Sequence, residues 1–446
     1  MATAAERLAN NMNFGALGRA TELRNRLLFT LGALIVFRLG TFLPIPGINP
    51  IALQQFFEQQ SSGILGIFDT FSGGALGRMG IFALGVMPYI SSSIIMTLMQ
   101  GSIPYMKSLK EQGSKGQRQL RQITRYVTVL IAALQGYGVS IGLESMQTAY
   151  GNIVIDPGLF FRITTVVTLV GGTIFLMWLG EQITEKGVGN GISLIIFAGI
   201  VAGLPIIVGN TYSSYANQEM DLFRVLMLCV VCIAITAGVV FVEQGARRIP
   251  VEYAKRQVGR KIYGGQRSHL PIRVNTAGVI PAIFASSLLQ FPVTIAALAP
   301  SGPIANWINA VMIRGGWLWN GVNAALIIFF AFFYTSITFR PDDVAENLKK
   351  HGGYIPGIRP GARTSDFIEK ILMRLTLVGG VYLAAVCVFP TILANRFGVQ
   401  FAFGGTSLLI VVGVALETFR QIEAHRQSLR YDSYVKKGTV RPRRGW

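Results

Sequence analysis

Long apolar runs dominate this sequence and set the first limit on its fold. Of its 446 residues, 51% are hydrophobic and 14% are charged, whereas soluble domains carry about 25% charged residues. About ten of the runs reach the length that an α-helix needs to cross a bilayer. Helices satisfy their own backbone hydrogen bonds and are therefore the structure that such runs adopt in lipid. We expect an all-α polytopic membrane protein with about ten transmembrane helices.

The placement of positive charge predicts how the chain is oriented. Polar connections that lack Lys and Arg alternate with connections crowded with both; the first kind covers 42–76, 142–161 and 209–222, and the second 101–125, 244–273 and 340–374. Lys and Arg mark the cytoplasmic side of a membrane protein. Since basic residues also precede the first span and follow the last, we expect both termini in the cytoplasm.

The polar stretch 209–219 divides the chain into two comparable parts with five expected spans each. An odd number of spans gives the two parts opposite orientations, so the topology favours two inverted five-helix halves around a central pore. The expected divisions are an N-terminal segment 1–22, a first half 23–215, a second half 216–420 with polar loops 243–274 and 340–370, and a basic tail 421–446.

One apolar piece is too short to cross. Ile64–Phe71 makes about two helical turns and is followed by Ser72-Gly73-Gly74 and then by the long run Ile81–Met99. A helix that cannot span is tolerated at membrane depth only where protein or a cavity surrounds it. Glycine supplies the unusual dihedral angles of a joint. We therefore expect the short piece inside a pore, with the other spans as its wall.

Side chains that carry chemistry lie outside the expected spans. The 3 histidines are in basic loops, and Glu181, Glu243 and Glu417 are at span ends. Cys229-x-x-Cys232 lies among Val, Leu and Ile, which favours packing over metal binding. We expect no catalytic residue, metal or cofactor. Two alternatives remain: a secondary transporter with its substrate site at broken helices, and an intramembrane hydrolase that uses Ser91–Ser93.

Two further motifs have plain structural interpretations. Gly187-x-Gly189-x-Gly191 lacks the spacing and the preceding strand of a nucleotide loop, which predicts a tight turn. Asp342-Asp343 and Lys349-Lys350 predict a short helix in the loop, with the acids in its first turn and the lysines in its last turn, where the helix dipole favours each charge.

Several long motifs follow one another in order and identify a family. They are Phe71–Leu76, Gly85–Ser91, Trp178–Thr184, Gly189–Ser193, Pro250–Arg256, His269–Pro271, Ala277–Phe284, Pro356–Gly361 and Phe403–Leu408. From about Arg24 to about Leu429 the chain resembles the SecY family, the channel subunits of the bacterial protein translocase.

The resemblance implies a role for named residues. It implies an aliphatic pore ring of Val86, Ile90, Ile192, Ile196, Ile283 and Ile410. It implies a plug at about 64–76 that includes Ile64, Ile67, Phe68, Phe71, Ser72, Gly73 and Gly74. It implies a lateral gate between about 81–99 and about 275–291, with Pro88, Ser91, Ser92, Asn275 and Pro281. It implies motor or ribosome docking at Arg256, Arg260, Arg359 and Arg363.

Local chemistry adds detail to these roles. Pro88 and Pro281 fall in the gate spans and are expected to kink them. Asn275 and Ser91–Ser93 are expected to hydrogen-bond across the closed gate. Arg38, near the outer end of the first span, is expected to snorkel or to cap a carbonyl. Arg359 is expected at a turn tip made by Pro356-Gly357 and Pro360-Gly361.

The resemblance also implies partners and a location. The expected partners are SecE and SecG, the SecA ATPase, the ribosome through rRNA phosphates without sequence reading, signal peptides and nascent chains, and membrane lipid. The expected location is the bacterial inner membrane. The implied function is passage of unfolded polypeptides across this membrane and lateral release of transmembrane segments into it.

Overall fold

The computed structural model describes most of the chain. The described residues are 21–60, 69, 71–145, 147–148, 151–217, 221–253, 256–258, 261–263, 267–298, 316–397 and 405–437. Four residues with an expected site role lie outside them: Ile64, Ile67, Phe68 and Arg260.

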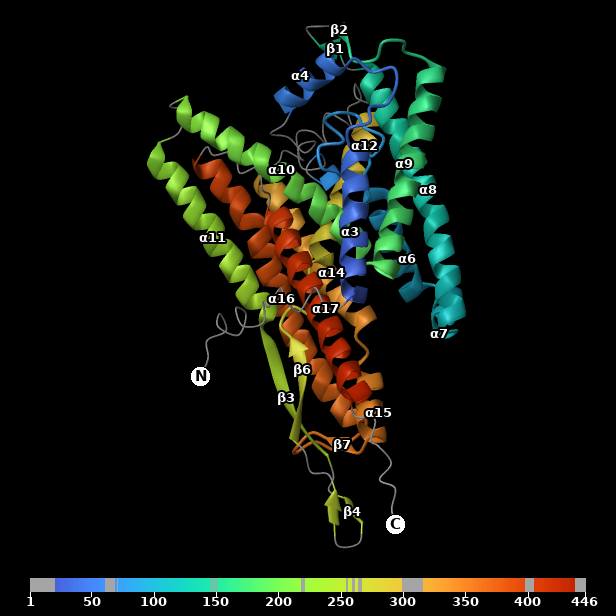
Figure 1. Cartoon of the computed structure of the whole chain (residues 1–446), viewed down its shortest axis with the longest axis vertical. Coiled ribbons are helices and arrows are strands. Elements are labelled where there is room, and N and C mark those ends of the chain that lie inside the picture. Colours follow the sequence, from blue (N-terminus) through green and yellow to red (C-terminus); the bar gives the residue numbers. More distant parts are fainter. Residues whose placement is uncertain are drawn as a thin grey trace.

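Long apolar helices account for most of the described chain (Figure 1). Seven are long and apolar enough to cross a membrane: α8 (Ser114–Ser145), α9 (Leu159–Lys186), α10 (Gly191–Ala216), α11 (Leu222–Gln244), α14 (Trp317–Thr338), α16 (Ala362–Phe397) and α17 (Gly405–Lys437). Three more occupy the remaining expected spans: α3 (Thr21–Gly40), α6 (Met87–Ser102) and α12 (Ile280–Leu298). The expected polytopic helical architecture is confirmed.

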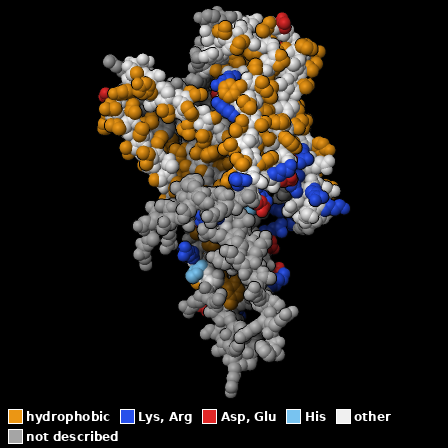
Figure 2. Space-filling view, in the orientation of Figure 1, with side chains coloured by type: hydrophobic (Ala, Val, Ile, Leu, Met, Phe, Trp, Pro, Cys, Tyr) orange, Lys and Arg blue, Asp and Glu red, His pale blue; other side chains and the backbone are white. Residues whose placement is uncertain are grey.

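The helices pack into one bundle with α12 near its middle (Figure 1). α8 packs on α9 and α6, and α14 packs on α16, while α12 contacts α6, α8 and α14 and so joins the two groups. A single large buried cluster draws on helices from both groups. Hydrophobic side chains are widespread over the upper part of the face in view (Figure 2), and Phe160, Phe223, Phe241 and Trp317 are each at least 75% exposed. Exposed apolar side chains in such number are what a lipid-facing bundle needs.

A small sheet projects from one end of the bundle (Figure 1). β3 (Ala246–Tyr253) pairs antiparallel with β6 (Arg267–Arg273) from Ala246↔Arg273 to Glu252↔Arg267. We call this end of the bundle the hairpin end, after the antiparallel pair of strands β3 and β6 that forms most of the sheet. The short β7 (Gly353–Tyr354) pairs with the other edge of β3. Both polar loops therefore contribute to one three-stranded sheet. Ile249, Ile272 and Ile355 are buried between this sheet and α16.

The other elements are short. α7 (Pro104–Glu111), α15 (Pro341–Lys350), and the paired strands β4 (Arg256–Val258) and β5 (Lys261–Tyr263) extend the hairpin end, whereas α4 (Pro50–Gln60), β1 (Gln147–Thr148) and β2 (Gly151–Asn152) lie at the opposite end. α15 has Asp342 and Asp343 in its first turn and Lys349 and Lys350 in its last. Residues 187–190 form the expected turn between α9 and α10.

The expected proline kinks in the gate helices are wrong. The apolar run 81–99 is not one helix, because 81–86 is a series of turns and α6 begins at Met87. Pro88 therefore lies in the first turn of α6, and Pro281 is the second residue of α12. A proline there removes no helical hydrogen bond, since the first N–H groups of a helix have no partner within it. The proline inside α12 is Pro292.

Candidate pore, plug and gate

The six expected ring positions converge on one buried apolar cluster. Five belong to its buried core, each at most 8% exposed, and Ile192 packs against it. They come from four helices, with Val86 as the N-cap of α6, Ile90 in α6, Ile192 and Ile196 in α10, Ile283 in α12 and Ile410 in α17. Branched aliphatic side chains from four helices therefore meet in one buried apolar cluster.

The described part of the plug segment, 69 and 71–76, lies against this cluster. Phe71 and Ala75 are buried in it, and Leu76 packs on it. Gly73 (φ +72°) and Gly74 (φ +81°) adopt backbone conformations that favour glycine. The segment therefore turns sharply at the two expected joint positions while its apolar side chains stay in the core.

Hydrogen bonds within the plug segment fold it into a compact turn. The Asp69 carboxylate accepts from the Gly77 N–H at 2.6 Å, and the Asp69 carbonyl accepts from the Ser72 hydroxyl at 3.0 Å. The same hydroxyl accepts from the Leu76 N–H at 3.1 Å. Burial raises the pKa of the Asp69 carboxyl, and the Gly77 hydrogen bond and the nearby Arg78 charge oppose that rise.

Two contacts fix the plug segment to the surrounding helices. Arg38 of α3 donates from its guanidinium to the Gly73 carbonyl at 2.6 Å, so the carbonyl-capping alternative for Arg38 is the one the structure has. On the other side Gly199 of α10 lies so close that an added Cβ would be 2.9 Å from the Phe71 carbonyl oxygen. The Arg38–Gly73 pairing joins residues 35 apart, and no sequence pattern indicates it.

The two expected gate helices touch in the described structure. α6 packs against α12, and the Ser287 hydroxyl lies 3.7 Å from the Met87 sulfur. Pro88, Ser91 and Ser92 are buried on α6, and Pro281 is buried on α12. The contact is mostly apolar, so its strength comes from packing more than from directional bonds.

The expected hydrogen bonds from Asn275 to the α6 serines are wrong. The Asn275 amide donates to Glu243 Oε1 at 2.6 Å and to the Gly278 carbonyl at 3.0 Å. Ser92 donates to the Thr124 carbonyl of α8 at 2.7 Å, and the buried Ser91 hydroxyl has no hydrogen-bond partner among the residues that the structure describes. Asn275 precedes α12 by five residues and so lies beyond the helix face that meets α6.

The three described docking arginines, Arg256, Arg359 and Arg363, lie at the hairpin end. Arg359 and Arg363 are exposed, and Arg256 lies in β4. The turn itself is at Pro356-Gly357, where the Ile358 N–H donates to the Ile355 carbonyl at 3.0 Å and Gly357 has φ +82°. Arg359 follows this turn instead of forming its tip, and its carbonyl accepts from the Thr364 hydroxyl at 2.9 Å.

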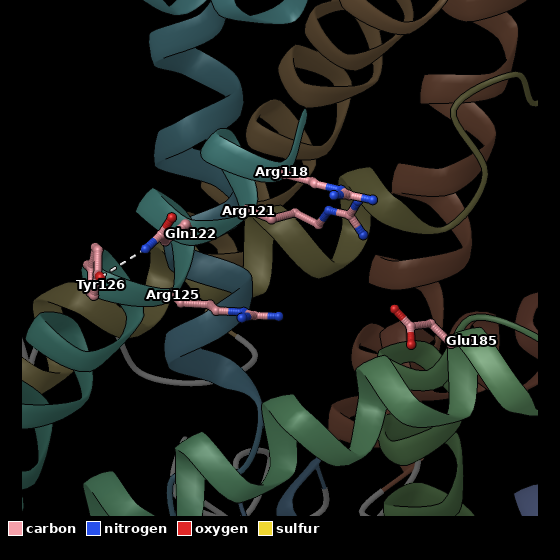
Figure 3. A pocket seen from close by; sticks show the side chains of 6 residues that line it. All are labelled: Arg118, Arg121, Gln122, Arg125, Tyr126 and Glu185. Carbon is pink, nitrogen blue, oxygen red and sulfur yellow. Dashed lines mark hydrogen bonds between the residues drawn. The ribbon is translucent and has the colours of Figure 1, made fainter. Parts of the chain in front are cut away.

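A basic cavity of about 510 Å³ lies at the hairpin end of α8 (Figure 3). Arg118, Arg121 and Arg125 come from successive turns of α8 and extend toward Glu185 of α9. Arg125 also donates from Nε to Glu181 at 3.1 Å. Gln122 and Tyr126 complete the lining and hydrogen-bond to each other at 3.1 Å. The three arginines belong to the basic connection 101–125, which is expected on the cytoplasmic side.

The six ring positions together form a buried aliphatic constriction, which we call the waist. A helical membrane bundle with such a waist, and with a short internal segment packed against it, defines the class of multi-pass channel proteins. The SecY family model matches residues 80–419. The protein translocase subunit SecY of Escherichia coli (strain K12) is 49% identical over 429 residues, which cover 96% of this chain and 97% of the relative. The chain belongs to the SecY family.

Solved structures share the fold across most of the chain. One concerns a SecY plug domain that stabilises the closed state of the translocation channel and maintains a membrane seal; its TM-score is 0.64 at 17% identity, with coverage of 91% of this chain and 93% of that one. Another is Sec61 in the canine ribosome–channel complex from the endoplasmic reticulum, with TM-score 0.59, 15% identity and the same coverage.

Proposed function

We propose that this chain is a protein-conducting channel of the bacterial plasma membrane, which passes unfolded secretory polypeptides across the membrane and releases transmembrane segments sideways into it. Membership of the SecY family supports this function. The structural observation that carries it is the single buried cluster in which the ring positions of four helices meet the plug segment.

The chemistry of the cluster suits a pore that must close to ions and open to protein. Branched aliphatic side chains shed water, so ions meet a barrier even where some space remains. The same side chains make no directional bonds and therefore do not discriminate between translocating sequences. The plug segment adds a second barrier, in agreement with what its structural neighbour describes for a SecY plug.

The α6–α12 contact is the proposed lateral gate. Its helices are joined by packing, with a single weak Ser287–Met87 hydrogen bond between polar atoms among the described residues. When an apolar signal peptide or transmembrane segment enters between α6 and α12, its own apolar contacts with the two helices replace the contacts that they made with each other. Parting these helices would open a path from the waist to lipid.

Power and assembly come from partners, and we propose no catalytic step in the chain itself. The exposed Arg359 and Arg363 and the three-stranded sheet would receive the SecA ATPase or a translating ribosome, whose rRNA phosphates suit basic side chains. A ribosome is part of the complex in which the similar Sec61 was solved. SecE and SecG would be stable partners, and the basic hairpin end would face the cytoplasm together with both termini.

Crosslinking tests this function directly. In a channel whose native cysteines are replaced by alanine, a stalled secretory chain that carries one cysteine should form a disulfide, under an added oxidant, with cysteines placed at Ile90 and Ile283, because both positions line the proposed passage. A cysteine at Val167, 65% exposed on the outer face of α9, is the control and should not react. Equal reaction at all three positions, or reaction at Val167 alone, would refute a path through the waist.

A further inference from the structure

The β3–β6 hairpin is tied together at the point where the chain turns toward α12. α11 ends at Gln244, and the hairpin begins with the Ala246↔Arg273 pair. The Val274 N–H then donates to the Gly245 carbonyl at 3.0 Å, which extends the pairing by one step. A displacement of the hairpin therefore reaches Val274 without being absorbed by a loose loop.

The Asn275 side chain connects this point to its two neighbours. It is 5% exposed, and its amide nitrogen donates both to Glu243 Oε1 at 2.6 Å and to the Gly278 carbonyl at 3.0 Å. Gly278 has φ +64° and forms the turn into α12. One side chain thus fixes the end of α11 and the start of α12 relative to each other, and its bond to a carboxylate is of the stronger charged class.

Two other helices hold the same point from outside. Arg420 of α17 donates to the Glu243 carbonyl at 2.9 Å. Gly379 of α16 lies so close that an added Cβ would be 3.0 Å from the Val274 carbonyl oxygen. The segment 274–278 is therefore confined between α11 and α16. A displacement of this segment is then passed along the chain to the start of α12.

We infer that Asn275 and Glu243 are positioning residues that transmit a displacement of the β3–β6 hairpin to the gate helix α12. This inference rests on the proposed docking of a motor at the hairpin end. A partner that moves the hairpin would shift the start of α12, and with it the face that packs on α6. Loss of the Asn275 bonds leaves 274–279 as irregular chain that absorbs the motion.

The test measures the gate contact with and without a docked motor. In the full-length chain with its native cysteines replaced by alanine, Met87→Cys and Ser287→Cys report the α6–α12 contact as disulfide yield, because these side chains touch. SecA is the added motor, and its binding is measured on the same preparation. We expect SecA to lower the yield at least threefold in the parent protein.

The variants separate transmission from docking. Asn275→Ala should bind SecA with an affinity within twofold of the parent. In this variant, however, bound SecA should lower the disulfide yield by less than 1.5-fold. Glu243→Gln keeps a carbonyl acceptor for the Asn275 amide and should restore most of the parent response. Glu346→Gln, an exposed acid of α15 at the same end of the bundle, is the control and should match the parent. If Asn275→Ala does not accumulate, Glu243→Ala removes the acceptor and takes its place.

Each contrary result has a distinct meaning. A parental response in Asn275→Ala or Glu243→Ala would overturn the transmission role. A parent protein that binds SecA without any change in yield would also overturn it and would leave docking intact. A parent that does not bind SecA would overturn the proposed docking, and the transmission role with it.

Discussion

Arg38 is a charged side chain in an apolar helix, and its partner explains why it is there. Its guanidinium donates to the Gly73 carbonyl and lies 4.8 Å from the centre of the Phe42 ring. Arg78 lies 4.4 Å from the centre of the same ring. A hydrogen bond from a charged donor to a partly buried carbonyl is worth about 1.5–3 kcal/mol. Arg38 therefore holds the joint of the plug segment in place.

Replacing Arg38 should loosen the plug. In Arg38→Ala, the loss of about 2 kcal/mol should raise the population of displaced plug at least tenfold and increase the ion conductance of the resting channel in planar bilayers. Arg24→Ala, at an exposed position on the same helix, should conduct like the parent. Equal conductance of the Arg38 and Arg24 variants would show that the Gly73 bond does not hold the plug.

The close approach of α10 to the plug segment predicts a second contrast. Gly199→Ala puts a methyl group against the Phe71 carbonyl and should push the plug segment off α10, which raises resting conductance. Gly203→Ala, one turn further along α10, meets nothing within 4 Å. It should leave conductance unchanged and increase helix stability by up to about 1 kcal/mol. Conductance that rises in both variants, or in neither, would contradict the proposed contact.

At the scale of elements, the plug segment is a part that can be removed without breaking the wall. The ten helices make their own contacts with one another, and the described plug residues pack against them and accept a hydrogen bond from Arg38. Its deletion should therefore affect the seal more than the passage.

Deleting Ile64–Leu76 tests this separation. The variant should still translocate a secretory protein into membrane vesicles, because the helices that form the waist remain. Its resting channel should leak ions, because the waist alone is left as a barrier. The measurements are protease protection of the imported protein and single-channel conductance. Unchanged conductance would show that the plug segment only fills space.

Elements also show how far the sequence predicts this fold. Apolar run length was enough to predict the helices, since a bilayer demands about 20 residues in each. It was not enough to locate the start of α6 at Met87, because the residues of the turns at 81–86 are as apolar as those of the helix. Charge alone predicts only a basic loop at 244–273, although Ile249 and Val251 alternate with outward residues, a signal for the strand that the structure has there.

The residues that form the candidate site could be predicted from the sequence, whereas most of the hydrogen bonds that hold them could not. The ring positions follow from the family resemblance, and the structure brings all six together. Arg38–Gly73 and Asn275–Glu243 were beyond the sequence, because such pairings depend on how separate elements dock. Asn275 has the right residue type for a gate hydrogen bond, but the docking of α11 gives it a carboxylate as a nearer partner.

At the scale of the whole molecule, charge is segregated along the long axis. Orange side chains cover the upper part of the surface, and the blue side chains gather mainly toward the hairpin end (Figure 2). On this face, the described Lys and Arg side chains thus gather toward the end where a motor or ribosome is proposed to bind. Such a basic surface steers an acidic or phosphate-bearing partner and does so less at high salt.

Reversing one exposed charge on this surface should weaken export without unfolding the channel. Arg359→Glu should lower SecA-driven transport into vesicles severalfold, while the protein inserts and assembles as the parent does. Lys370→Glu makes the same charge change at another exposed site on α16 and is the control. Normal export by the Arg359 variant, with equal amounts of protein in the membrane, would remove Arg359 from the docking surface.

The central position of β3 has a consequence for recognition. Since β6 and β7 flank the same strand, residues from two loops about a hundred positions apart keep a fixed spacing. A synthetic peptide that copies either loop alone would lack half of this epitope and its preorganised shape. Such peptides should compete poorly for any binder of the intact surface, and antibodies raised against them should recognise the native protein weakly.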